Sequence, residues 1–291
     1  MDWHERLAAS ELPGPLEPGS GDDLVARLDR LVVQQEDAWP ELRRARDAWF
    51  ACRYREVALG AFRVRLEYNP AREASVAAPV DPASIRRRAC FLCPDQMPPP
   101  ERGLAVDRDF ALFLNPFPIF YPHPVVIHRD HRPQALDACL PAMFPLARRL
   151  VGRFSLLYNG PRCGASAPDH LHFQAIPRYS TLIEADVHHL AEPALAGRRR
   201  ELPVIEGVAA FTIDGYGRTV IVLEGGQEAA LRRAVAGWLH RLPADPVGTE
   251  PLVNLLLWYG QTGWTAVLFP RRRHRPSNYA VAPNGDRKSV V

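Results

Sequence analysis

The stretch His170-Leu171-His172-Phe173-Gln174 lies near the middle of the chain, directly after a glycine-containing loop. Read as a β-strand, its period of two places both histidines and the glutamine on one face and the leucine and phenylalanine on the other. The apolar face can pack against a core, and the other face can carry out chemistry. The stretch therefore predicts a strand at the centre of both the fold and the functional site.

The composition indicates a globular protein without a disulfide framework. The chain has 291 residues, of which 47% are apolar, and its 29 prolines favour many short strands and firm turns. A net charge of +3 is too small to indicate nucleic-acid binding, and we interpret the arginine clusters at 86–88 and 198–200 as solvated faces. No secretory signal or membrane-length apolar run is visible, so we expect a cytoplasmic protein with no membrane partner.

The hydrophobic pattern predicts helices and short strands in a repeated order. Helices are expected over 22–32 with Asp22 as the cap, and over 40–54, 136–154, 184–190 and 225–242. Strands are expected over 62–68, which should be half-buried, and over 110–115, 119–127, 154–158, 170–174, 203–213, 219–223, 252–259 and 264–269. The order strand, strand, helix, strand, strand thus occurs about twice, once on each side of residue 180.

The polar face of the central stretch suggests attack on phosphorus. A neutral histidine with one ring nitrogen held by a backbone carbonyl is a suitable nucleophile, and His172 is the candidate. Gln174 can donate its amide hydrogen to a phosphate oxygen in the transition state. Gly164 and Ser166, in the preceding loop, can bind phosphate oxygens through backbone N–H groups and a hydroxyl. From the residues alone, the alternating histidines can equally form a polar face or half of a metal site.

A second cluster of residues has the character of a metal site. Cys90 and Cys93 form a CxxC pair, which can be a metal knuckle, a redox pair or a coincidence. A closed tetrahedral zinc site needs two further ligands, for which His131 and His170 are the best candidates, with His128 as the alternative. Zinc would then anchor the strand beside the nucleophile.

These residues together resemble the histidine-triad superfamily, in particular its transferase branch, which includes galactose-1-phosphate uridylyltransferase, diadenosine tetraphosphate phosphorylase and the nucleotide-sugar phosphorylases. The third position of the triad is Gln174, as in the transferases, whereas the hydrolases have a histidine there. Cys90, Cys93, His131 and His170 resemble the zinc ligands in type and order. Asn159, Gly164 and Ser166 resemble the phosphate-holding loop, and Arg72 and Arg271 resemble phosphate-contacting arginines. The segments from 69 to 72 and from 115 to 131 are similar to parts of the nucleotide pocket.

The resemblance implies an α+β fold of two histidine-triad-like halves, each an antiparallel sheet with flanking helices. It divides the chain into an N-terminal helical extension (1–58), a catalytic half (59–180), a second half (181–276) and an unstructured tail (277–291). Leu171 stands where the uridylyltransferase has proline, and the preceding Ala167-Pro168-Asp169 is closer to the sequence of diadenosine tetraphosphate phosphorylase.

The resemblance further implies a nucleotidyltransferase or phosphorylase that acts on a dinucleoside polyphosphate or nucleotide sugar. His172 would form a covalent nucleotidyl intermediate, and inorganic phosphate or a sugar phosphate would accept the nucleotide. Structural zinc is expected, with no organic cofactor, and a homodimer is compatible with the family. The alternatives are a hydrolase on the same scaffold, with water as acceptor, and a non-catalytic zinc-stabilised module that binds nucleotides or RNA.

Overall fold

The computed structural model describes residues 2–7, 24–70, 82–195, 197–248 and 250–273. The helices in these ranges are α1 (Trp3–Arg6), α2 (Leu24–Ala38), α3 (Pro40–Phe50), α5 (Pro82–Arg87), α6 (Leu136–Arg149), α7 (Leu182–His189) and α8 (Glu228–Leu239), with a short 3₁₀ turn at Pro193–Leu195. The strands are β1 (Arg53–Leu59), β2 (Phe62–Tyr68), β3 (Leu104–Ala105), β4 (Phe110–Leu114), β5 (Pro124–His128), β6 (Phe154–Asn159), β7 (His172–Pro177), β8 (Arg199–Glu201), β9 (Ala209–Ile213), β10 (Ile221–Gly225), β11 (Val253–Gly260) and β12 (Gly263–Pro270). The expected cap Asp22 and the tail 277–291 lie outside the described residues.

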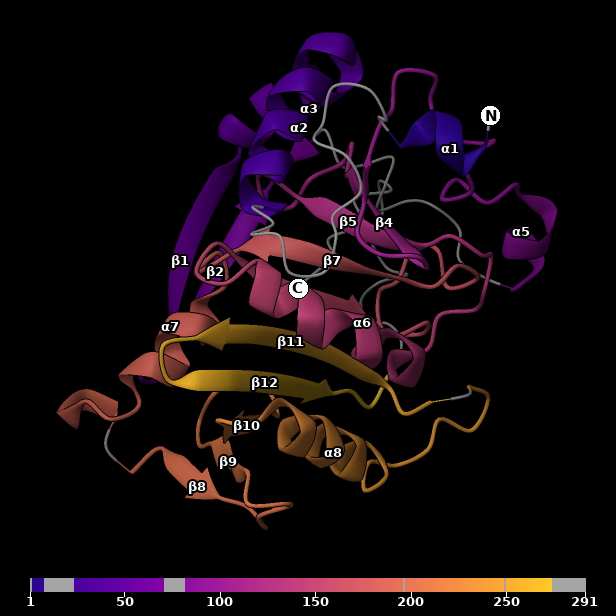
Figure 1. The fold of residues 1–291 in the computed structure, drawn as a ribbon. Coiled ribbons are helices and arrows are strands. Elements are labelled where there is room, and N and C mark those ends of the chain that lie inside the picture. Colours follow the sequence, from indigo (N-terminus) through magenta and orange to yellow (C-terminus); the bar gives the residue numbers. More distant parts are fainter. Residues whose placement is uncertain (1, 8–23, 71–81, 196, 249, 274–291) are drawn as a thin grey trace.

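Ten of the described strands form one sheet in the order β3-β4-β5-β7-β6-β11-β12-β10-β9-β8, and each neighbouring pair is antiparallel. The first half runs β4, β5, α6, β6, β7 along the chain, and the second half runs β9, β10, α8, β11, β12. In both halves the last strand lies between the second and the third. The α+β fold of two antiparallel halves is therefore confirmed, and the halves join through β6 and β11 into one continuous sheet (Figure 1).

The two faces of the sheet have different roles. On one face, α2, α3, α6 and α8 pack with the sheet in the largest apolar cluster, which includes Phe173 and Ala175 of β7. Figure 1 shows α6 lying across β11 on this face. On the opposite face lie two smaller apolar clusters, one containing Ile127 of β5 and the other Ile176 of β7. The alternation along β7 directs His172 and Gln174 to this second face.

The hairpin β1–β2 departs from two expectations. The helix expected over 40–54 ends at Phe50, and Arg53–Leu59 form a strand that pairs with β2. The hairpin is possible because Gly60 occupies the tight turn with a φ of +62°. The expected half-burial of β2 is also wrong, since Leu66 is 48% and Tyr68 60% exposed. Alternation of apolar and polar residues thus predicted the strand, but the sheet that it joins has only two strands.

Two strands near the site begin later than expected. The strand expected over 119–127 begins at Pro124, and the central strand begins at His172, so His170 precedes it. The backbone N–H of His170 donates to Ala167 in a turn, and that of Leu171 donates to Arg132. His170 and His172 are consequently held by different neighbours. None of the helices in the described ranges has the length and apolar character that a membrane span needs.

Candidate active site and metal centre

His172 lies at the start of β7, in the interior of the sheet, and is only 5% exposed. Its Nδ1–H donates to the backbone carbonyl of His170 over 2.7 Å. Because a carbonyl can only accept, this contact leaves the lone pair of the neutral ring on Nε2. Burial lowers the pKa of His172, which favours the neutral ring. The arrangement has the fixed tautomer that a histidine nucleophile requires.

Gln174 lies on the same face of β7, and His123 fixes the orientation of its amide. The Nδ1 atom of His123 accepts the backbone N–H of Ile119 over 3.2 Å, so its Nε2 carries the hydrogen. That Nε2 lies 2.7 Å from Oε1 of Gln174 and donates to it. With its oxygen engaged, Gln174 has its NH₂ group available to donate to a phosphate oxygen. No sequence pattern indicated this role for His123, because only the fold brings β7 beside the start of β5.

Gln134 lies between β6 and β7 at the point where these two strands separate. Their pairing extends to Leu157 and Gln174 and then stops. The buried Gln134 amide donates to the carbonyls of Asn159 and His172 over 2.9 and 2.8 Å and accepts the His172 N–H over 2.8 Å. Gln134 thus makes the backbone hydrogen bonds to His172 that a neighbouring strand would otherwise make. No sequence signal marked Gln134, which lies in a loop before α6.

The expected phosphate loop follows β6. Gly164 and Ser166 are exposed, whereas Cys163, Ala165 and Ala167 between and beside them are buried. Gly164 has a φ of +102°, which favours glycine. The buried side chains of Cys163, Ala165 and Ala167 anchor the loop, and Gly164 and Ser166 remain accessible from outside.

Asn159 and Arg271 border this loop. Asn159 is the last residue of β6 and lies opposite Asn254 of β11. Arg271 follows β12, and its positive charge acts on the Cys163 thiol, although burial dominates and raises the pKa of Cys163 to about 11. Arg72, the other expected phosphate-contacting arginine, lies outside the described residues.

The four expected metal ligands come together from three separate parts of the chain. The ligand atoms of Cys90, Cys93, His131 and His170 all lie within 4.8 Å of one another. The Sγ–Nδ1 distances are 3.3 Å for Cys90 and His170, 3.3 Å for Cys93 and His131, and 3.6 Å for Cys93 and His170. Tetrahedral zinc, with bonds of about 2.3 Å to sulfur and 2.0–2.1 Å to nitrogen, would separate such atoms by about 3.5 Å. The group could therefore hold a metal ion, and its donors fit zinc.

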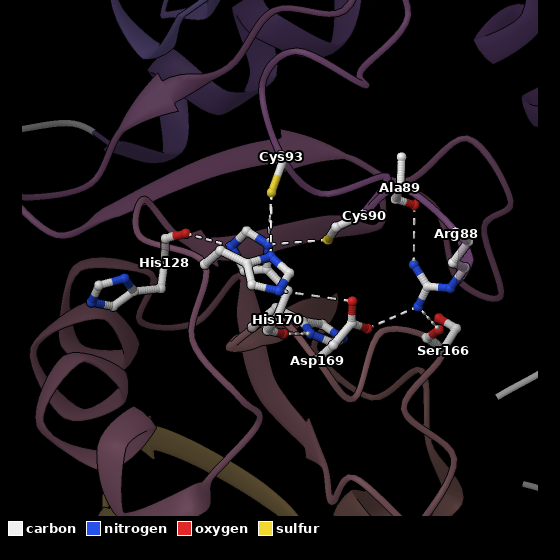
Figure 2. A network of polar contacts seen from close by, with 10 residues as sticks. Arg88, Ala89, Cys90, Cys93, His128, Ser166, Asp169 and His170 are labelled. Atoms are coloured by element: carbon white, nitrogen blue, oxygen red, sulfur yellow. Dashed lines mark hydrogen bonds and ion pairs between the residues drawn. The ribbon is translucent and has the colours of Figure 1, made fainter. Parts of the chain in front are cut away.

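Among these candidate ligands, His170 has a ring that is also held by a backbone hydrogen bond (Figure 2). Its Nε2–H donates to the backbone carbonyl of His128 over 2.8 Å, which leaves Nδ1 to face the cysteine sulfurs. The alternative ligand, His128, is turned away: its Nδ1 accepts the backbone N–H of Asp130 over 2.9 Å. Burial raises the pKa of the Cys93 thiol to about 12, and a bound metal ion would reverse this by stabilising the thiolate.

A polar network connects the group of candidate metal ligands with the loop that contains Ser166 (Figure 2). The Asp169 carboxylate lies 3.9 Å from Nε2 of His131 and 2.8 Å from Nη2 of Arg88. The same Nη2 of Arg88 donates to the backbone carbonyl of Ser166 over 3.3 Å. The expectation of a solvated arginine cluster at 86–88 is therefore wrong for Arg88, whose side chain is 22% exposed. Sequence alone could not separate it from its exposed neighbours Arg86 and Arg87.

Comparison with known proteins identifies the fold. The yeast Ap4A phosphorylase is similar in structure, with a TM-score of 0.51, 16% identity, and coverage of 80% of this chain and 82% of that chain. Its complex with Ap4A gives a TM-score of 0.50, with 16% identity and coverage of 80% and 81%. An ADP-glucose phosphorylase from Arabidopsis thaliana with bound ADP-glucose gives 0.44, with 12% identity and coverage of 76% and 89%.

The structural likeness shows that this chain has the same fold as the yeast Ap4A phosphorylase, which agrees with the expected α+β fold. A search of curated proteins finds no match. A family model described as "Domain of unknown function (DUF4922)" matches residues 31–177, which include the CxxC pair and the stretch from His170 to Gln174. This match spans half of the chain, and the protein therefore belongs to the DUF4922 family.

Proposed function

We propose that this protein is a nucleotidyltransferase or phosphorylase that acts through a covalent nucleotidyl-histidine at His172. The observation that carries the proposal is the hydrogen bond of 2.7 Å from Nδ1 of His172 to the carbonyl of His170. It leaves Nε2 as the attacking atom and would stabilise the positive charge that the ring gains when it attacks.

The first step joins Nε2 of His172 to the α-phosphorus of the donor. The bond from that phosphorus to its bridging oxygen breaks, and the rest of the phosphate chain leaves with the electron pair. Gln174, oriented by His123, would donate to a nonbridging oxygen of the phosphorus under attack. One such oriented donor contributes on the order of 3 kcal/mol to lowering the barrier.

In the second step, an oxygen of an acceptor attacks the same phosphorus, and the bond from phosphorus to Nε2 breaks. This restores the neutral ring of His172. Inorganic phosphate as acceptor makes the enzyme a phosphorylase, and a sugar phosphate makes it an exchanging transferase. Asn159, Gly164, Ser166, Arg72 and Arg271 are proposed to bind the phosphates of donor and acceptor.

We also propose that Cys90, Cys93, His131 and His170 hold a structural zinc ion. The sulfur–nitrogen distances support this assignment. Because the His170 carbonyl accepts the Nδ1–H of His172, the same residue would serve the metal with its ring and the nucleophile with its backbone. Rigidity at the metal would thus be passed directly to the nucleophile.

The test is capture of the intermediate. The protein is mixed with diadenosine tetraphosphate or ADP-glucose labelled at the α-phosphorus of the adenylate, and protein-bound label is counted after rapid quenching. We expect an acid-labile label that is lost in His172→Asn and kept in His189→Asn, a matched exposed histidine of α7.

The role of the acceptor is tested with the same reagents. If inorganic phosphate accelerates loss of the label and appears in the product, the enzyme is a phosphorylase. Release into water at the same rate with and without phosphate would instead indicate a hydrolase. Tight nucleotide binding without label from either donor would contradict the covalent mechanism and favour a binding module.

A further inference from the structure

Asn254 belongs to the second half of the chain but contacts the candidate site of the first half. It lies on β11, directly opposite Asn159 of β6, where the two halves of the sheet meet. Its Nδ2 lies 2.6 Å from Oδ1 of Asn159 and 2.7 Å from the backbone carbonyl of Cys163. One side-chain amide therefore contacts both the end of β6 and the phosphate loop.

The backbone contact determines which way both amides point. The carbonyl oxygen of Cys163 can only accept a hydrogen bond, so the group of Asn254 that faces it must be the NH₂. The same NH₂ group faces Asn159, and the Asn159 atom beside it must therefore be the oxygen. With its oxygen engaged by Asn254, Asn159 has its own NH₂ group turned to another direction.

The strand register shows what that direction means for the site. Leu157 of β6 pairs with Gln174, and Asn159 lies two residues further along the same strand, so its side chain is on the same face of the sheet. His172 and Gln174 also face this side. Asn159 and Gln174 are thus two amides on one face, each with its oxygen bound by a donor: Asn254 for the first and His123 for the second.

We propose that Asn254 is a positioning residue, which holds the Asn159 amide with its NH₂ group toward the phosphates of the substrate. This inference rests on the proposed function, because it presupposes that Asn159 binds the phosphates of a nucleotide substrate. It also gives the second half of the chain a role in the reaction. β12, which takes the place of β7 in that half, carries no histidine, so the second half contributes through β11 instead.

The test compares Asn254→Asp with the unmodified protein in the labelling assay with diadenosine tetraphosphate. Aspartate keeps the size of the side chain but cannot donate to Asn159 or to the Cys163 carbonyl. We expect the rate of label formation at saturating donor to fall by about tenfold to a hundredfold. The donor concentration for half-maximal rate should change much less, because most binding contacts remain.

A double variant separates positioning from a general structural effect. If Asn254 acts through the amide of Asn159, then Asn254→Asp should have little further effect on the rate once Asn159→Ala has removed that amide. The matched control is Leu256→Val, two residues along β11 on the same face, which pairs with Leu157 instead. It should weaken the core slightly while the folded protein is labelled at the unmodified rate.

Two outcomes would overturn the inference while the proposed function stands. One is labelling of Asn254→Asp at the unmodified rate, and the other is an undiminished effect of that substitution in the Asn159→Ala background. Failure of the unmodified protein to take label from either adenylate donor would contradict the proposed function, and the positioning role with it.

Discussion

Replacement of Gln134 by leucine should destabilise the protein and disturb His172 together. Gln134 is 1% exposed, and its side chain makes three hydrogen bonds, all to backbone groups of Asn159 and His172. Gln134→Leu keeps a similar volume but leaves one N–H and two carbonyls of the backbone without this partner. A buried group that loses its partner costs about 1–3 kcal/mol, so three such groups predict a loss of about 3–9 kcal/mol in the free energy of unfolding.

This loss is large compared with the total stability of a folded domain, which is about 5–15 kcal/mol. Urea denaturation followed by tryptophan fluorescence and circular dichroism measures it by linear extrapolation. The matched control is Gln227→Leu, because Gln227 is exposed before α8 and its side chain makes no capping hydrogen bond there. That control should change the stability by no more than about 0.5 kcal/mol.

Gln134→Glu refines the prediction. It keeps an acceptor for the His172 N–H but directs a carboxylate oxygen at two carbonyls, so it should also destabilise the protein at neutral pH and less so at low pH. A loss below about 1 kcal/mol for Gln134→Leu would refute the reasoning, since it would mean that these backbone groups do not depend on Gln134.

Two further predictions concern stability. Purified protein should contain about one zinc ion per chain by mass spectrometry, as in a closed structural site. Cys90→Ser should lose the zinc and melt at a lower temperature, whereas Cys52→Ser, outside the group of candidate ligands, should keep it. Equal zinc content in both variants would contradict the ligand assignment. Burial raises the pKa of the Glu101 carboxyl from 4.5 to about 8, so between these values the unfolded chain binds fewer protons than the folded one, and the free energy of unfolding falls as pH rises. Glu101→Gln should flatten this decline, which can reach about 1.4 kcal/mol per pH unit, in urea titrations at pH 5, 6.5 and 8. Glu41→Gln, at an exposed position, should leave the slope as it is, and parallel slopes for all three proteins would show that Glu101 is already ionised.

The local sequence carries enough information for most elements near the site. The local hydrophobic pattern predicts β4, β6 and the hairpin β11–β12 as short apolar runs between proline or glycine breaks, and helical spacing predicts α6 and α8, because each of these elements buries at least one face in the same large cluster. The same rule misjudges β2, whose alternation has no large partner sheet, and misses β1 beside it. Periodicity reports which face could be buried and does not specify what covers it.

Residue type and spacing also predicted the group that could hold a metal ion, since the five cysteines of this chain include one close pair, Cys90 and Cys93. His172 and Gln174 were predicted as candidates in the same way, and their roles remain predictions. Candidate metal ligands and nucleophiles can be found in a sequence because these functions need particular side chains. The resemblance to a family motif then assigns each candidate a role by its position in the motif.

The tertiary structure alone decided which neighbours hold those side chains. His123, Gln134, Arg88 and Asn254 are ordinary polar residues in sequence, and they lie 51, 38, 81 and 95 positions from Gln174, His172, Asp169 and Asn159, the residues they contact. Their amide and ring orientations follow from backbone groups that meet only when the sheet is assembled. The sequence by itself thus determined the candidate side chains and the two-halved fold. The orientation of these side chains depends on hydrogen bonds between distant segments, which no local pattern encodes.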